Sequence, residues 1–129
     1  MKPPTRRRRL LLATPAILFS LGILFLSSTP GSQVPSTGIA YGDKVEHVVE
    51  YLVYGLLLLL PTRDLGWRGR WISLGAGLAF AAFDEAFQTT VPGRVGDIAD
   101  WAADAVGLVM AVVAASVLPR FTVKSESRT

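Results

Sequence analysis

The sequence contains no cysteine, a single histidine and few charged residues. Without cysteine, the 129-residue chain has no disulfide, no thiolate metal site and no cysteine nucleophile. Charged residues make up 18% of the chain, whereas soluble domains typically contain about 25%. The polar residues are too sparse for a separate soluble catalytic domain. Any chemistry must therefore come from side chains on apolar helices or on their connections.

Four long apolar stretches lie between the charges. They are residues 10–28, 45–60, 71–91 and 98–118. At about 1.5 Å per residue, a helix of about 20 residues matches the hydrocarbon core of a bilayer, which is roughly 30 Å thick. The short connections favour antiparallel neighbours. We therefore predict an all-α fold, an integral membrane bundle of four transmembrane helices.

Basic residues are concentrated on one side of these predicted spans. Eleven of the thirteen precede the first stretch, separate the second from the third, or follow the fourth. The other side has only Lys44 and Arg94. By the positive-inside rule, we expect both termini of this multi-pass membrane protein to be cytoplasmic. Membrane orientation also explains the net charge of +3, so no nucleic-acid partner is predicted.

Composition divides the chain into four regions. Residues 1–28 contain the basic N-terminus and the first transmembrane helix, and residues 29–42 form an outer loop rich in Pro, Gly and Ser. Residues 43–118 hold the other three helices, and residues 119–129 form a cytoplasmic tail. A cleaved signal peptide is the alternative for the first region. The long apolar run and the lack of a small-x-small cleavage site favour a retained helix.

Acidic residues are concentrated on the side opposite the basic ones. Eight of the ten lie at the outer ends of the last three spans: Asp43, Glu46, Glu50, Asp84, Glu85, Asp97, Asp100 and Asp104. An Asp at the centre of a membrane helix costs about 2.5–3.5 kcal/mol on insertion scales, so such residues are seldom without a partner or a use. Helical spacing gives each span a polar stripe: Asp43 with His47 and Glu50, Asp84 with Gln88, and Asp97 with Asp100 and Asp104. We therefore expect a common outward pocket lined by Asp43, His47, Asp84, Gln88, Arg94, Asp100 and Asp104.

Three motifs occupy these outer ends. They are Asp43-Lys44-x-x-His47-x-x-x-Tyr51, Asp84-Glu85-x-x-Gln88 and Pro92-Gly93-Arg94-x-Gly96-Asp97-x-x-Asp100-x-x-x-Asp104-x-x-Gly107. Together they resemble the VanZ-like family of small bacterial membrane proteins, named for a protein associated with teicoplanin resistance. The resemblance covers residues 43–118 and implies a cell-envelope protein with a site on its outer face. It implies no particular reaction.

The residue types at this site suggest roles for its members. His47 with a carboxylate such as Asp84 or Asp100 is the candidate catalytic acid–base group if the protein is an enzyme, which the sequence leaves open. The candidate binding residues are Lys44, Tyr51, Glu85, Gln88, Arg94, Asp97 and Asp104. The forked guanidinium of Arg94 suits a phosphate or a carboxylate. An ordinary inter-helix ion pair of Arg94 with Asp84 or Asp100 is the alternative.

The depth of the site predicts its ligand class. The polar cluster lies where the headgroup of a lipid or peptidoglycan precursor meets its chains, so we expect such a molecule to be bound. Eight carboxylates against two cations give a local charge of −6, so a divalent cation (Mg²⁺, Ca²⁺, Mn²⁺ or Zn²⁺) is also a candidate. A small ion- or proton-coupled transporter and a non-catalytic membrane scaffold remain alternatives. The sequence does not determine the oligomeric state.

Overall fold

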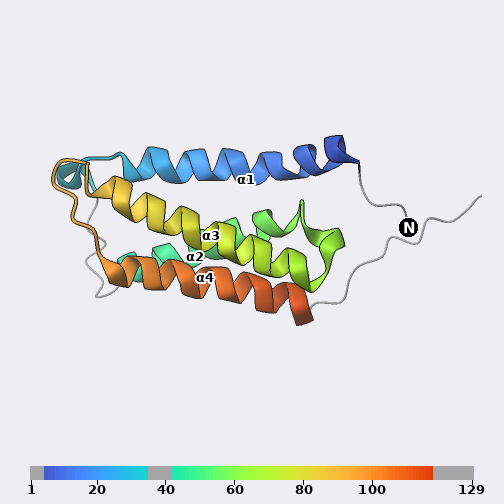
Figure 1. Ribbon diagram of the computed structural model, residues 1–129. Helices are drawn as coiled ribbons and strands as arrows, with labels where there is room; N and C mark the ends of the chain where they lie inside the picture. Colours follow the sequence, from blue (N-terminus) through green and yellow to red (C-terminus); the bar gives the residue numbers. More distant parts are fainter. Residues whose placement is uncertain (1–4, 35–41, 118–129) are drawn as a thin grey trace, which may run out of the picture.

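The structure, a computed structural model, describes residues 5–34 and 42–117 as four α-helices without any strand in those ranges (Figure 1). The helices are α1 (Arg6–Ser27), α2 (Gly42–Leu59), α3 (Trp67–Gln88) and α4 (Ile98–Val117), with 3-10 turns η1 (Gly31–Gln33) and η2 (Arg63–Leu65). Successive helices run antiparallel along the long axis of the bundle (Figure 1). The predicted all-α fold is confirmed, and one helix forms in each predicted apolar stretch.

Hydropathy distinguishes α1 and α4 from the other two helices. Both are long and apolar enough to cross a membrane. α2 and α3 have 18 and 22 residues and are also long enough, but their polar and charged side chains leave no sufficiently apolar stretch of 18 residues. The structure thus supports two membrane-spanning candidates directly.

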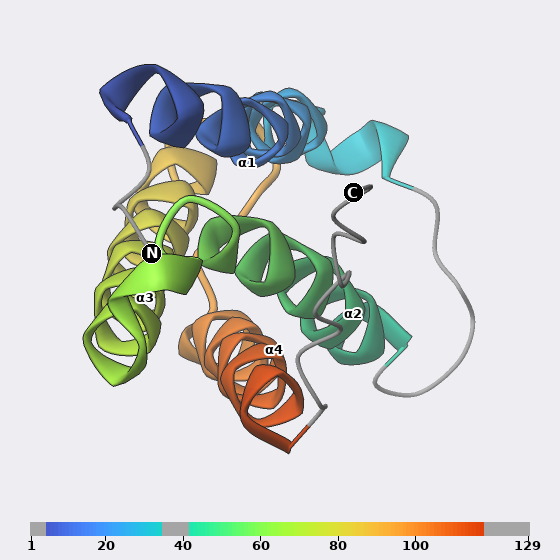
Figure 2. The ribbon, with the colours of Figure 1, turned by 90° about the vertical axis from the view of Figure 1, so that its right-hand side faces the viewer.

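Viewed along its axis, the bundle has α1 and α4 on opposite sides, with α2 and α3 between them (Figure 2). The buried core is small and consists largely of aromatic and small side chains. Tyr54 lies at its centre, with ring centroids 6.2 Å from Phe19, 5.8 Å from Tyr51 and 5.1 Å from Phe80. This aromatic cluster connects α1, α2 and α3 below the polar end of the bundle.

α2 and α4 approach each other closely because small residues line their contact. A Cβ atom at Gly107 would collide with the backbone of Val48 and Leu52, and one at Gly55 would lie 2.7 Å from Cβ of Ala111. Asp104, Gly107 and Ala111 are all buried along this side of α4. The small residues Gly107 and Ala111 of α4 therefore form a helix–helix contact with α2.

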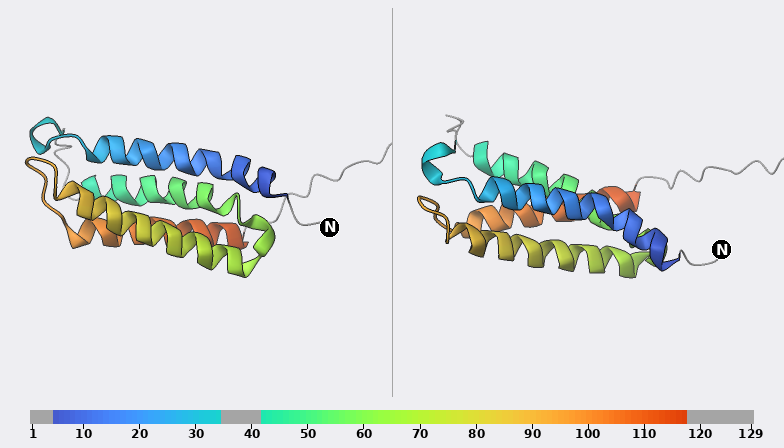
Figure 3. Two further views of the ribbon diagram at one scale, coloured as in Figure 1. Left: turned by 45° about the horizontal axis from the view of Figure 1, so that its top comes forward. Right: turned by 90° about the horizontal axis from the view of Figure 1, so that it is seen from above.

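The η1 segment and the α3–α4 turn meet at one end of the bundle (Figure 3). The backbone N–H of Gly31 donates to the carbonyl of Pro92 over 3.1 Å, and Gly93 takes the positive φ of 75° that the turn requires. The arginines of α1, η2 and α3 lie at the opposite end, where Arg9 pairs with Asp64 at 2.5 Å. Lys2, Arg120, Lys124 and Arg128 fall outside the described residues.

Candidate functional site

Lys44 connects the start of α2 to the start of α4. Its Nζ lies 3.0 Å from Asp43 and 2.7 Å from Asp97, and it also donates to Asp100. The ammonium group lowers the pKa of the Asp97 carboxyl below its usual value. Asp97 is therefore ionised at neutral pH, and this part of the acidic cluster already has its counter-charge.

His47 forms a second link between α2 and α4, one turn deeper. Its Nδ1 lies 2.7 Å from Oδ1 of Asp104, which is only 1% exposed. Its Nε2 is 3.8 Å from Oδ1 of Asp100, beyond hydrogen-bond distance. A buried carboxylate thus orients the imidazole and leaves Nε2 free to accept or donate a proton, the geometry that acid–base chemistry needs.

A separate polar network lies between α1 and α3. Ser27 Oγ donates to Oδ2 of Asp84 over 3.0 Å, and Gln88 Nε2 donates to the same oxygen over 3.1 Å. Arg94, from the α3–α4 turn, donates through Nη2 to Oε1 of Gln88. Asp84 is 2% exposed, and its Oδ1 is buried without a hydrogen-bond partner. One carboxylate oxygen in this network is therefore unsatisfied.

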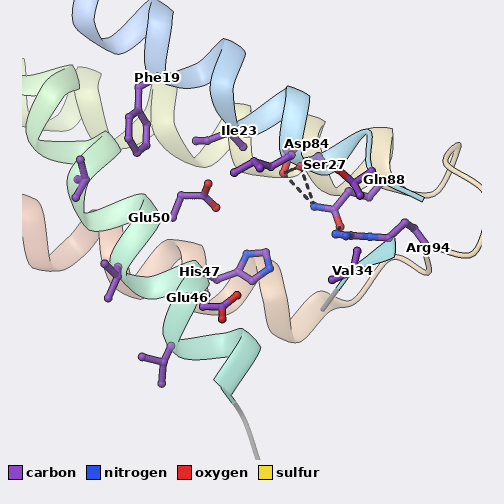
Figure 4. A pocket seen from close by; sticks show the side chains of 15 residues that line it. Phe19, Ile23, Ser27, Val34, Glu46, His47, Glu50, Asp84, Gln88 and Arg94 are labelled. Atoms are coloured by element: carbon purple, nitrogen blue, oxygen red, sulfur yellow. Dashed lines mark hydrogen bonds between the residues drawn. The ribbon is translucent and has the colours of Figure 1, made fainter. Parts of the chain in front are cut away.

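A pocket of about 670 Å³ opens between α1 and α2, with residues of α3 and the α3–α4 turn at its polar end (Figure 4). The polar residues around it are Ser27, Thr29, Glu46, His47, Glu50, Asp84, Gln88 and Arg94. The rest of its wall is mainly apolar and includes Phe19 and Ile23 from α1 and Val49 and Val53 from α2. One cavity therefore has a charged end and an apolar side.

The structure divides the predicted site into two groups. His47, Asp84, Gln88 and Arg94 line the pocket. Asp43, Asp100 and Asp104 do not line it, because they pair with Lys44 and His47. The acids therefore belong to two adjoining networks and do not all line one cavity.

Four further candidates lie apart from the pocket: Lys44, Tyr51, Glu85 and Asp97. Lys44 and Asp97 pair with each other at the α2–α4 end. Glu85 accepts a hydrogen bond from the backbone N–H of Asp97. Tyr51 is fully buried, and its ring packs edge-on against Tyr54. Tyr51 therefore lies in the core of the bundle.

Glu46, Glu50 and Ser27 line the pocket although the sequence did not select them as binding residues. Glu50 belongs to the same stripe of α2 as His47, so its direction could be read from helical spacing. Ser27 comes from α1, which carries none of the motifs. Which face of α1 meets α3 depends on tertiary packing, and no pattern in the sequence indicates it.

The predicted cation has no ready-made site in the part of the chain that the structure describes. No group of three or more His, Asp or Glu side chains in those residues is placed to hold a metal ion. Pairing with Lys44 and His47 spreads the carboxylates over separate networks.

Comparison with protein families agrees with the motifs. A family model described as VanZ/LLP1 matches residues 8–119, so the match includes α1 as well as the motif-bearing helices. Searches of curated proteins and of solved structures find no significant match. The matched segment covers most of the chain and confirms the predicted resemblance. The chain therefore belongs to the VanZ/LLP1 family.

Proposed function

We propose that this protein crosses a prokaryotic plasma membrane four times, with both termini in the cytoplasm. α1 and α4 have the length and hydropathy of membrane helices. α2 and α3, with 18 and 22 residues, are about 27–33 Å long and reach across the same thickness. The buried polar residues of α3 contact neighbouring helices, and its arginines lie near its start. With its polar and charged side chains in these positions, α3 can be surrounded by lipid.

Within that membrane protein, we propose that the pocket binds the headgroup of an amphipathic envelope molecule, a lipid or a peptidoglycan precursor. The observation that carries the proposal is the division of the pocket into a charged end and an apolar side. Val45, Val49 and Val53 line it and are also exposed on the outer surface of α2. The pocket therefore opens onto the surface that would face acyl chains. Its volume lies in the range of about 300–1,000 Å³ typical of ligand sites.

Arg94 is the residue best suited to the anionic part of such a headgroup. Within residues 5–34 and 42–117, it forms no ion pair. Among those residues its guanidinium makes one hydrogen bond, to Gln88, which leaves other N–H groups of the fork unused. A phosphate or carboxylate beside Arg94 would gain charge-assisted hydrogen bonds while its chain follows the apolar wall.

Lipid analysis of the purified protein tests this proposal. Wild type, Arg94→Ala, Arg94→Lys and the control Arg68→Ala, at the opposite end of the bundle, would be extracted in mild detergent and their bound amphiphiles identified by mass spectrometry. We expect wild type and Arg68→Ala to retain one anionic amphiphile that Arg94→Ala loses. Retention by Arg94→Lys indicates recognition of charge alone, and its loss indicates bidentate recognition. An identical inventory in all four proteins would contradict the proposal.

A further inference from the structure

The pocket has more acceptors than its own cations satisfy. Glu50 projects from α2 into it, opposite Asp84 of α3 (Figure 4). Among the residues that the structure describes, Glu50 takes part in no ion pair. Asp84 is nearly completely buried, lines the pocket and has one oxygen without any partner. Carboxylates in apolar surroundings are unfavourable unless a donor or a cation meets them.

We infer that the pocket binds a primary ammonium group, held by Glu50 and Asp84 and carried by the headgroup of an amphiphile. An ammonium group offers three N–H donors and no acceptor, which complements two carboxylates with spare lone pairs. The assignment of the ammonium group to an amphiphile rests on the proposed function. The ammonium site itself rests on Glu50 and Asp84 alone.

The surroundings favour an organic cation over a metal ion. In the described part of the chain, His, Asp and Glu residues form no group of three that could coordinate a metal. Divalent metals need several oxygen ligands at fixed distances, whereas an ammonium group needs only well-placed acceptors. Glu50 and Asp84 also share the pocket with Phe19, Ile23 and Val53. This apolar wall can pack against carbon atoms attached to the nitrogen.

A second cavity gives the attached chain a path. It has a volume of about 560 Å³, is lined mainly by α1, and shares Phe19, Ile23, Leu26 and Glu50 with the first pocket. Glu50 therefore lies where the two cavities meet. An ammonium group at Glu50 would have its alkyl chain along α1, and any anionic group on the same headgroup would extend toward Arg94.

Binding of simple probes to the purified full-length protein tests this inference. Dodecylamine, 1-dodecanol and dodecyl phosphate share one chain and differ only in the head, and butylamine carries the ammonium without the chain. Affinities would be measured by native mass spectrometry of the protein released from detergent micelles. We expect wild type to bind dodecylamine about tenfold or more tightly than dodecanol, because hydrogen bonds to charged groups are the stronger kind.

Variants then assign the selectivity to the carboxylates. Glu50→Gln keeps the shape of the side chain and removes its charge, so we expect the preference for dodecylamine over dodecanol to fall to about threefold or less. Asp84→Asn should act in the same direction. Asp43→Asn makes the same change of charge at the same end of the bundle, outside the pocket, and should leave the preference unchanged.

The outcomes separate this inference from the proposed function. Equal binding of dodecylamine and dodecanol by wild type would overturn the ammonium site while leaving an amphiphile pocket in place. Binding of butylamine as tight as that of dodecylamine, with dodecyl phosphate unbound, would keep the ammonium site and contradict the amphiphile. A preference that survives in Glu50→Gln and Asp84→Asn would also overturn the inference, because it would show non-specific attraction.

Discussion

At the scale of single residues, Asp104 shows how a motif position can act through another side chain. It is almost fully buried and contacts Nδ1 of His47 over 2.7 Å, so it positions the imidazole without lining the pocket. We predict that Asp104→Ala lowers the free energy of unfolding by about 1–3 kcal/mol, because it leaves a ring nitrogen of His47 without its partner. Chemical denaturation in detergent, followed by circular dichroism, would measure the change.

Two companion variants make this prediction specific. Asp104→Asn retains an oxygen that can accept from Nδ1, so most of the stability should remain. Asp43→Ala removes an exposed acid whose partner, Lys44, keeps Asp97 and Asp100. Its effect should stay within about 0.5 kcal/mol, as for ordinary surface substitutions. Equal losses in Asp104→Ala and Asp43→Ala would contradict the structural role of the buried acid.

At the scale of the helices, the contact between α2 and α4 depends on Gly107. A methyl group there would meet the Val48 carbonyl and the Leu52 amide of α2, so the helices would have to separate. We predict that Gly107→Ala destabilises the bundle by about 1–3 kcal/mol, the usual effect of overpacking. Thermal unfolding monitored by circular dichroism would show a lower midpoint.

Gly75 supplies the matched control for this substitution. It lies in α3 with no heavy atom within 4 Å of the position that a Cβ would take. Gly75→Ala should leave stability unchanged or raise it by about 0.5–1 kcal/mol, since alanine is the better helix former. If both alanine variants unfolded alike, the close approach of α2 and α4 would not be the cause.

The helices and the facing of their polar stripes follow directly from sequence. Apolar runs locate all four helices, and helical spacing places Asp84 with Gln88 and Asp104 with Gly107 on shared faces, which the structure shows to be buried. The division of the acids into two networks could not be predicted in this way. It depends on the reach of Lys44 to Asp97 and Asp100 and on the docking of Ser27 against Asp84. Both are contacts between distant segments, and helical periodicity contains no information on them.

At the scale of the whole molecule, most acids lie at one end of the bundle and most arginines lie at the other. Lys44, Arg94 and the acidic networks lie near the η1 segment and the α3–α4 turn, while Arg9, Arg63 and Arg70 lie near the start of α1 and η2. In a membrane, the two ends of this bundle would therefore differ markedly in their number of positive charges. Because the positive-inside rule counts arginine and lysine near the ends of the spans, the end near η2 should face the cytoplasm.

Single cysteines can test this orientation, since the chain has none of its own. We predict that a membrane-impermeant maleimide labels Ser32→Cys in intact spheroplasts, because the proposed orientation places η1 outside the cytoplasm. Thr5→Cys and Leu65→Cys, at the opposite end, should be labelled only after the membrane is permeabilised. All three positions are exposed in the structure, so differences in labelling report the side of the membrane. Labelling of Leu65→Cys in intact spheroplasts would reverse the proposed orientation, and a mature chain beginning near Thr29 would show that α1 is cleaved.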